Sequence, residues 1–368
     1  MKKNLVVLVG ILAFGISNNA MAQTFLKDVF KNRFLVGAAL NEAQFSGRDE
    51  KGAALAAAQF NTITPENVLK WEHVHPQPGT YAFASSDRYV EFGEKNGMVI
   101  IGHTLVWHSQ TPRWVFQDST GKPASRELLL ERMRDHISTV VGHYKGRIKG
   151  WDVVNEALNE DGSLRDSPWM KIIGEEYLVK AFEFAHDADP KAELYYNDYS
   201  LENPPKRNGA VALIKKLQAA GVHVAAVGLQ GHYKMDWPSM ALVDSAIDAF
   251  ASLGIKVNIT ELDIDVVPAT QQRRSADVSA NNYHAVNENL FAAGLPDSVQ
   301  VELAKRYGDL FRVFVRHADV VGRVTFWGVA DGNSWLNSFG RVNYPLLFDR
   351  NYLHKPAFDA VVKAGQKL

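Results

Sequence analysis

The 368-residue sequence contains no cysteine, which excludes disulfide bonds, thiolate metal sites and a cysteine nucleophile. It also lacks an excess of either charge, because 40 lysines and arginines face 41 aspartates and glutamates, a formal net charge of −1. Without a basic excess the chain has no electrostatic basis for binding nucleic acid or an anionic membrane surface, and we expect neither partner. Charged residues at 22% and aromatic residues at 11% are typical of a folded protein and exclude disorder for the bulk of the chain.

Long apolar runs are also scarce, and the run at 5–16 is shorter than the about 20 residues that cross a membrane. It follows Lys2 and Lys3 and precedes the small-residue pattern Ala20-Met21-Ala22. This order predicts a signal peptide over 1–22 that is cleaved after Ala22, rather than a membrane anchor. We therefore expect an exported protein, periplasmic or extracellular, that is not inserted in the membrane after cleavage.

The remainder, 23–368, shows no linker or change of composition and is predicted to form one domain. A unit of apolar strand, polar loop and amphipathic helix repeats along it. The eight strands expected are Phe34–Leu40, Phe60–Glu66, Met98–Trp107, Ile148–Glu156, Ala192–Tyr199, Ala226–His232, Lys256–Asp263 and Arg323–Ala330.

Helical periodicity is clearest over Arg126–Tyr144, behind a candidate N-cap at Ser125, and over Asp297–His317. Strands apolar on both faces that alternate with helices indicate a parallel sheet covered by helices. Eight such units predict an α/β fold of the closed (β/α)8 TIM-barrel type. The alternative, an open doubly wound sheet, usually has a glycine-rich phosphate turn after its first strand, and 37–41 lacks that spacing.

The predicted strands end in polar and aromatic residues, where a barrel of this type builds its active site. Two glutamates stand out, since Glu156 and Glu261 each follow an apolar run and belong to strands three apart around an eight-stranded ring. A carboxylate pair about 5–5.5 Å apart is what retaining glycoside hydrolysis requires. An ion pair with a barrel lysine or arginine is the alternative for each glutamate, but Asn155 beside Glu156 favours a site that donates to a sugar hydroxyl.

Tryptophans supply the second indication, because the flat C–H faces of sugars pack on indole rings. Trp107, Trp327 and Trp335 all fall at the predicted strand-end face and are expected to contact substrate. Trp151, near the start of a strand, is expected to lie in the core instead.

Five segments resemble, in order, the motifs of glycoside hydrolase family 10, the endo-1,4-β-xylanases. They are Thr64-Pro65-Glu66-Asn67-Val68-Leu69-Lys70-Trp71, Gly102-His103-Thr104-Leu105-Val106-Trp107-His108, Trp151-Asp152-Val153-Val154-Asn155-Glu156-Ala157, Gly228-Leu229-Gln230-Gly231-His232 and Ile259-Thr260-Glu261-Leu262-Asp263. The resemblance implies that Glu156 is the acid/base, that Glu261 is the nucleophile, and that xylan and xylo-oligosaccharides are the substrates. It further implies that Asp263 orients His232 and that Tyr199 reaches toward the aglycone side. The implied substrate-binding residues on the glycone side are Glu66, Asn67, Lys70, His103, Trp107, Asn155, Gln230, His232, Trp327 and Trp335.

Three other functions are alternatives to this one. A metal hydrolase would use some of the histidines at 73, 75, 103, 108 and 232, but their spacing is poor, and we expect neither metal nor cofactor. A non-catalytic glycan-binding barrel would be expected to have lost one carboxylate. A β-1,4-glucanase with mixed xylan and cellulose activity is the nearest alternative. We expect a monomer, and the segment 266–296 gives no indication of its role.

Overall fold

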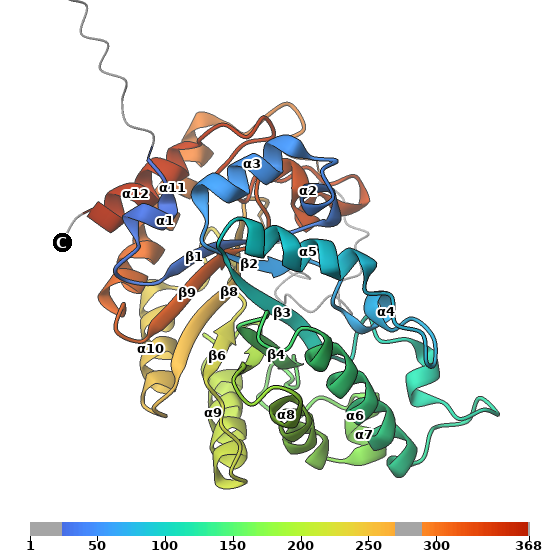
Figure 1. Ribbon diagram of the computed structural model, residues 1–368. Helices are drawn as coiled ribbons and strands as arrows, with labels where there is room; N and C mark the ends of the chain where they lie inside the picture. The colour runs from blue at the N-terminus through green and yellow to red at the C-terminus, as the bar shows by residue number, and fades with distance from the viewer. Residues whose placement is uncertain (1–23, 269–288, 367–368) are drawn as a thin grey trace, which may run out of the picture.

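The computed structural model describes residues 24–268 and 289–366 and contains a closed barrel of parallel strands wrapped by helices (Figure 1). The predicted signal peptide over 1–22 and most of the segment 266–296 lie outside the described residues. The strands are β1 (Leu35–Leu40), β2 (Thr62–Pro65), β3 (Val99–Val106), β4 (Gly150–Asn155), β5 (Glu193–Asp198), β6 (Ala226–Leu229), β7 (His232–Lys234), β8 (Lys256–Asp265) and β9 (Val321–Phe326).

Eight of these strands form the barrel, and all their pairings are parallel. Neighbours along the chain pair from β1 to β6, β6 then pairs with β8, β8 with β9, and β9 with β1, which closes the ring. The predicted (β/α)8 barrel is therefore confirmed. Its strands are buried almost throughout, which is why they read as apolar on both faces.

Most strand ends lie within two residues of the prediction, but two of them differ by three or more. The sixth strand was expected to continue to His232, but Gly231 has a φ of +83°, so β6 stops at Leu229 and the chain resumes as the short strand β7. That strand pairs with the far end of β8, beyond the barrel itself. The last strand, expected to reach Ala330, ends at Phe326, and Gly328 with a φ of +133° turns the chain away just after Trp327. Both turns lie at the carboxyl end of the barrel.

Helices cover the outside of the barrel (Figure 1). The longer ones are α3 (Glu50–Gln59), α5 (Ala84–Lys95), α6 (Arg126–His143), α8 (Glu176–Ala188), α9 (Pro204–Ala219), α10 (Met240–Ala251), α11 (Asp297–Arg316) and α12 (Pro356–Gln366). The shorter ones are α1 (Leu26–Val29), α2 (Glu42–Phe45), α4 (Trp71–Val74), α7 (Pro168–Ile173) and the 3-10 turns η1 (Arg113–Phe116), η2 (Asp331–Asn333) and η3 (Trp335–Gly340).

The two helices predicted most clearly are confirmed to within one residue, as α6 and α11. Ser125 caps α6 as expected, since its side chain accepts a hydrogen bond from the Leu128 amide. Trp151 is 1% exposed and lies in the core as predicted, against Gly102 of the neighbouring strand. No helix within 24–268 and 289–366 is long and apolar enough to span a membrane.

Candidate active site

An open pocket of about 180 Å³ lies at the carboxyl ends of the barrel strands. All but two of the predicted site residues line it, together with Gln110, which the sequence analysis did not select. The lining residues are Glu66, Asn67, Lys70, His103, Trp107, Gln110, Asn155, Glu156, Gln230, His232, Glu261, Trp327 and Trp335. Since they come from strands far apart in the sequence, barrel closure is what brings them together.

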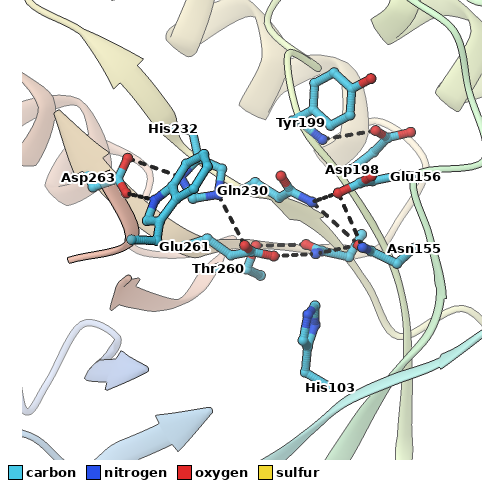
Figure 2. Close-up of polar contacts among 12 residues, drawn as sticks. His103, Asn155, Glu156, Asp198, Tyr199, Gln230, His232, Thr260, Glu261 and Asp263 are labelled. Atoms are coloured by element: carbon cyan, nitrogen blue, oxygen red, sulfur yellow. Dashed lines mark hydrogen bonds and ion pairs between the residues drawn. The ribbon is translucent and has the colours of Figure 1, made fainter. Parts of the chain in front are cut away.

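Glu156 stands immediately after β4 with a φ of +58°, an uncommon conformation for a side chain of this size. Its amide donates to the carbonyl of Asn197 at 2.9 Å, which continues the β4–β5 ladder and holds the residue there. Strained backbone of this kind collects at functional sites, where surrounding structure fixes it. The carboxyl group accepts a hydrogen bond from Trp107 Nε1 at 2.8 Å. It accepts a second from Gln230 Nε2 at 2.9 Å (Figure 2).

The surroundings of Glu156 favour its protonated form. Burial is the main cause that raises its pKa, and the negative charges of Asp198 and Glu261 raise it further. The hydrogen bonds from Gln230 and Trp107 act in the opposite direction, and the resulting pKa is about 7. A carboxyl group with this pKa can donate a proton near neutral pH and later accept one.

Glu261 is held as a carboxylate in β8. Asn197 Nδ2 donates to its Oε1 at 2.9 Å, and His232 Nε2 lies 3.1 Å from its Oε2. Burial raises the pKa of Glu261, but the hydrogen bond from His232, the charges of His103 and His232 and the Asn197 amide outweigh burial and lower the pKa below its ordinary value. The two glutamates therefore differ in protonation, as acid and nucleophile must in retaining hydrolysis.

His232 is placed between two carboxylates. Its Nδ1 lies 3.0 Å from Asp263 Oδ1, and Asp263 Oδ2 accepts a hydrogen bond from Trp335 Nε1 at 2.7 Å. Burial lowers the pKa of His232, but Asp263 and Glu261 outweigh this effect and raise it to about 10. The ring is therefore a cation that donates to Glu261, and Asp263 fixes both this ring and the Trp335 indole.

Side-chain amides connect the two glutamates (Figure 2). Asn155 Nδ2 donates to Glu156 at 3.3 Å, and its Oδ1 accepts from Asn197 Nδ2 at 2.9 Å. Asn197 Nδ2 also donates to Glu261, while its Oδ1 accepts a hydrogen bond from Thr260. Asn197 is not among the residues predicted from the sequence, because its bridging position depends on the register of β5 between β4 and β6.

A second polar group lies at the start of α4. Lys70 Nζ donates to Gln110 Oε1 at 2.8 Å and to Asn67 Oδ1 at 3.1 Å, and it lies 5.1 Å from the centre of the Trp107 ring. Burial lowers the pKa of Lys70, although Glu261 and Glu66 act against it, and burial raises the pKa of Glu66. The group offers donors and acceptors beside an indole face, the combination that binds a sugar. Gln110 has a φ of +45°, a feature that no sequence pattern indicated.

His103 forms the floor of the pocket between the glutamates and Trp327. Its Nδ1 lies 2.9 Å from Asp152 Oδ2 inside the barrel. The centres of its ring and of the Trp327 ring are 5.5 Å apart, and the ring planes are inclined at 75°. The Asp152 contact leaves the opposite ring nitrogen for the pocket. His103 was predicted from the sequence but Asp152 was not, because Asp152 lies three residues before the end of β4, inside a buried strand.

Tyr199 does not line the pocket. The residue is 1% exposed, its hydroxyl accepts a hydrogen bond from Arg165, and Figure 2 shows its ring directed away from the two glutamates. Asp263 also lies behind the pocket wall, at the position expected of a residue that orients His232. Within 24–268 and 289–366, no group of three or more histidine, aspartate or glutamate side chains is arranged to hold a metal ion.

The family model of glycosyl hydrolase family 10 matches residues 25–364. This chain belongs to that family. A relative named endo-1,4-β-xylanase A, from Xylanibacter ruminicola, is 43% identical over 357 residues, which are 96% of this chain and 97% of the relative.

Solved structures of the family agree with the fold. A family 10 endoxylanase from a sugarcane soil metagenome is 45% identical and superposes with a TM-score of 0.86 over 93% of this chain and 100% of its own. An intracellular xylanase of Thermoanaerobacterium saccharolyticum, solved as a variant in complex with xylotriose, is 36% identical with a TM-score of 0.81 over 93% of this chain and 99% of its own. The resemblance that the five sequence motifs indicated is therefore confirmed for the family and the fold.

Proposed function

We propose that the chain is an endo-1,4-β-xylanase that hydrolyses internal xylosidic bonds of xylan by a retaining double displacement. Glu156 is the acid/base and Glu261 the nucleophile. The observation that carries the proposal is a pair of buried carboxyl groups in one pocket whose pKa values are displaced in opposite directions, with amide donors bridging them. Xylan is proposed as the substrate because the chain shares 43–45% sequence identity with proteins named as endo-xylanases.

In the first step, the Glu261 carboxylate attacks the anomeric carbon while the bond from that carbon to the glycosidic oxygen breaks. Glu156 gives its proton to the departing oxygen, so the leaving sugar departs as a neutral alcohol. The product is a covalent ester between Glu261 and the glycone. The hydrogen bond from His232 holds the attacking carboxylate in place.

In the second step, the Glu156 carboxylate takes a proton from a water molecule whose oxygen attacks the same carbon. The ester bond to Glu261 breaks, and both glutamates return to their starting protonation states. Loss of the Glu261 charge in the intermediate lowers the pKa of Glu156, which favours its change from acid to base. The Asn155 amide can donate to the sugar 2-hydroxyl, a contact that strengthens in the transition state.

Hydrolysis rates and product stereochemistry test this function together. We expect arabinoxylan and glucuronoxylan to be hydrolysed faster than carboxymethylcellulose, and NMR of the first product to show the β-anomer before mutarotation. Early appearance of the α-anomer would instead require an inverting mechanism, with Glu261 as a base acting through water. Equal rates on xylan and soluble cellulose would favour the β-1,4-glucanase.

We also propose that the enzyme is exported and begins at Gln23 after cleavage. The support is the order of basic, apolar and small residues over 1–22, which lie outside the described residues. N-terminal sequencing of the protein from periplasmic and culture fractions of an expressing bacterium tests it. Full-length protein that keeps Met1 in the cytosolic fraction contradicts it.

A further inference from the structure

A buried ion pair lies directly behind the acid/base residue. Lys206 Nζ is 2.9 Å from Asp198 Oδ1, and both side chains are fully buried. The Asp198 carboxylate also accepts hydrogen bonds from the Tyr199 amide at 2.9 Å and from the Tyr196 hydroxyl. An ammonium group and two hydrogen-bond donors thus surround this carboxylate, which does not line the substrate pocket.

The strand register places this anion beside Glu156. Asn155 of β4 is paired with Asn197 of β5, so the next residues on the two strands, Glu156 and Asp198, are neighbours. Figure 2 shows the two side chains next to each other. The backbone carbonyl of Asp198 accepts a hydrogen bond from the backbone N–H of Gln230 at 3.1 Å. This bond fixes the end of β5 on the side of β6.

Lys206 occupies a position that is unfavourable for a lysine. It lies in the first turn of α9, where the helix dipole is positive, and burial of an ammonium group carries a further cost. Asp198 and the Tyr199 ring, whose centre is 3.2 Å from Nζ, offset these costs. A helix that needed only stability could place an apolar residue here, which points to a role for the charged pair.

We propose that the Asp198–Lys206 pair maintains a permanent negative charge beside Glu156 and so keeps this carboxyl protonated, as the acid step requires. Asp198 is then a positioning residue that never touches substrate. The inference rests on the role of Glu156 proposed above.

Other charged groups also face Glu156, and Asp198 differs from the nearest of them in that its charge is unchanged during the reaction. Glu261 is the other nearby anion, and its charge disappears when it bonds to the sugar, whereas the charge of Asp198 persists through both steps. Several titratable or charged side chains surround Glu156 from the strands, helices and loops packed against it. They are Asp198, Glu261, Lys70, Arg165, Tyr177 and His108, and His232 lies behind Glu261. Glu202, also buried, has its pKa raised by burial and lowered in part by Lys206.

The alkaline limb of the pH profile of kcat/KM tests the proposal. For xylo-oligosaccharides, whose leaving group needs the proton, the midpoint of this limb reports Glu156 in the free enzyme. Asp198→Asn removes the anion and leaves Lys206 positive, so we expect the midpoint to move to lower pH, on the order of one unit. A purely structural role would lower kcat or stability without moving the midpoint.

A second variant guards against failure to fold, because breaking a buried pair destabilises a protein more than replacing both partners. Asp198→Asn combined with Lys206→Met removes both charges, and we expect a smaller shift in the same direction, since Asp198 is the member beside Glu156. Asp331→Asn is the matched control. It breaks a comparably buried pair with Lys355 at 2.8 Å on the opposite side of the barrel and should leave the midpoint unchanged.

Wild-type alkaline midpoints in both Asp198 variants, or midpoints displaced to higher pH, would overturn the proposal. Glu156→Gln, measured on an aryl glycoside with an activated leaving group, separates this failure from failure of the proposed function. If Glu156→Gln retains the alkaline limb, the acid/base assignment is wrong. If it loses the limb while the Asp198 variants keep the wild-type midpoint, only the role of the ion pair is wrong.

Discussion

At the scale of single residues, the site contains two glutamates whose different surroundings give their carboxyl groups different protonation states. Glu156 is flanked by carboxylates and apolar walls, whereas Glu261 receives the cationic His232 and an amide. The sequence identified both glutamates from their positions after apolar runs. Their distinct environments come from other strands, so the opposite displacement of the pKa values could be read only from the structure.

A bell-shaped pH dependence of kcat/KM follows from these environments. Activity needs Glu156 protonated and Glu261 ionised, so it should fall above about pH 7 as Glu156 loses its proton. It should also fall at acidic pH, below the ordinary range of a glutamate, as Glu261 is protonated. Glu156→Gln, measured on an aryl glycoside with an activated leaving group, should lose the alkaline fall and keep the acidic one. An alkaline fall with the wild-type midpoint in this variant would show that another group titrates there.

At the scale of elements, the loops after the strands complete the site. Trp335 begins η3, and its indole both closes the pocket and donates to Asp263 behind His232. The sequence predicted the sugar contact of Trp335 but not this hydrogen bond, because the two residues lie 72 positions apart and meet only through the end of β8.

Removal of the Trp335 ring should relax the preference for xylose. A glucose unit carries a hydroxymethyl group that a packed pocket resists at a cost of about 1–3 kcal/mol. This corresponds to roughly 5- to 150-fold in rate if the clash persists in the transition state. Trp335→Ala should therefore raise the ratio of kcat/KM on cello- to xylo-oligosaccharides, while lowering activity on the latter through lost stacking.

Trp335→Phe is the control for this change, because it keeps most of the ring and loses only the hydrogen bond to Asp263. It should lower kcat while leaving the substrate ratio near that of the wild type. If Trp335→Ala leaves the ratio unchanged, steric exclusion at this wall does not explain the specificity.

At the scale of the whole molecule, the barrel depends on close contacts between adjacent strands. A Cβ atom added at Gly102 of β3 would lie 2.1 Å from the buried Trp151 ring of β4. Gly102→Ala should therefore destabilise the protein by about 1–3 kcal/mol, as overpacking of a core usually does.

Gly142 provides a control for which the expected change in stability has the opposite sign. It lies exposed in α6, where an added Cβ would meet no atom within 4 Å, so Gly142→Ala should stabilise the protein by about 0.5–1 kcal/mol. Urea unfolding followed by circular dichroism measures both variants. A Gly102→Ala protein as stable as the wild type would mean that the Trp151 ring can move to accommodate the added methyl group at little cost.

The sequence alone determined the barrel, most strand positions, the two helices α6 and α11 and most of the residues around the pocket. It could do so because buried positions recur regularly along strands and helices and must be apolar, which leaves a pattern in the sequence. In a parallel barrel, moreover, the carboxyl ends of all strands lie on one face. Tertiary structure decided the rest. Asn197, Gln110, Asp152 and the Asp198–Lys206 pair act through partners on other strands or helices, and Tyr199, expected at the substrate, is turned away beside Lys206. The physical reason is that hydrogen bonds and charge interactions depend on strand register and on distances of a few ångströms, which the order of residues does not contain.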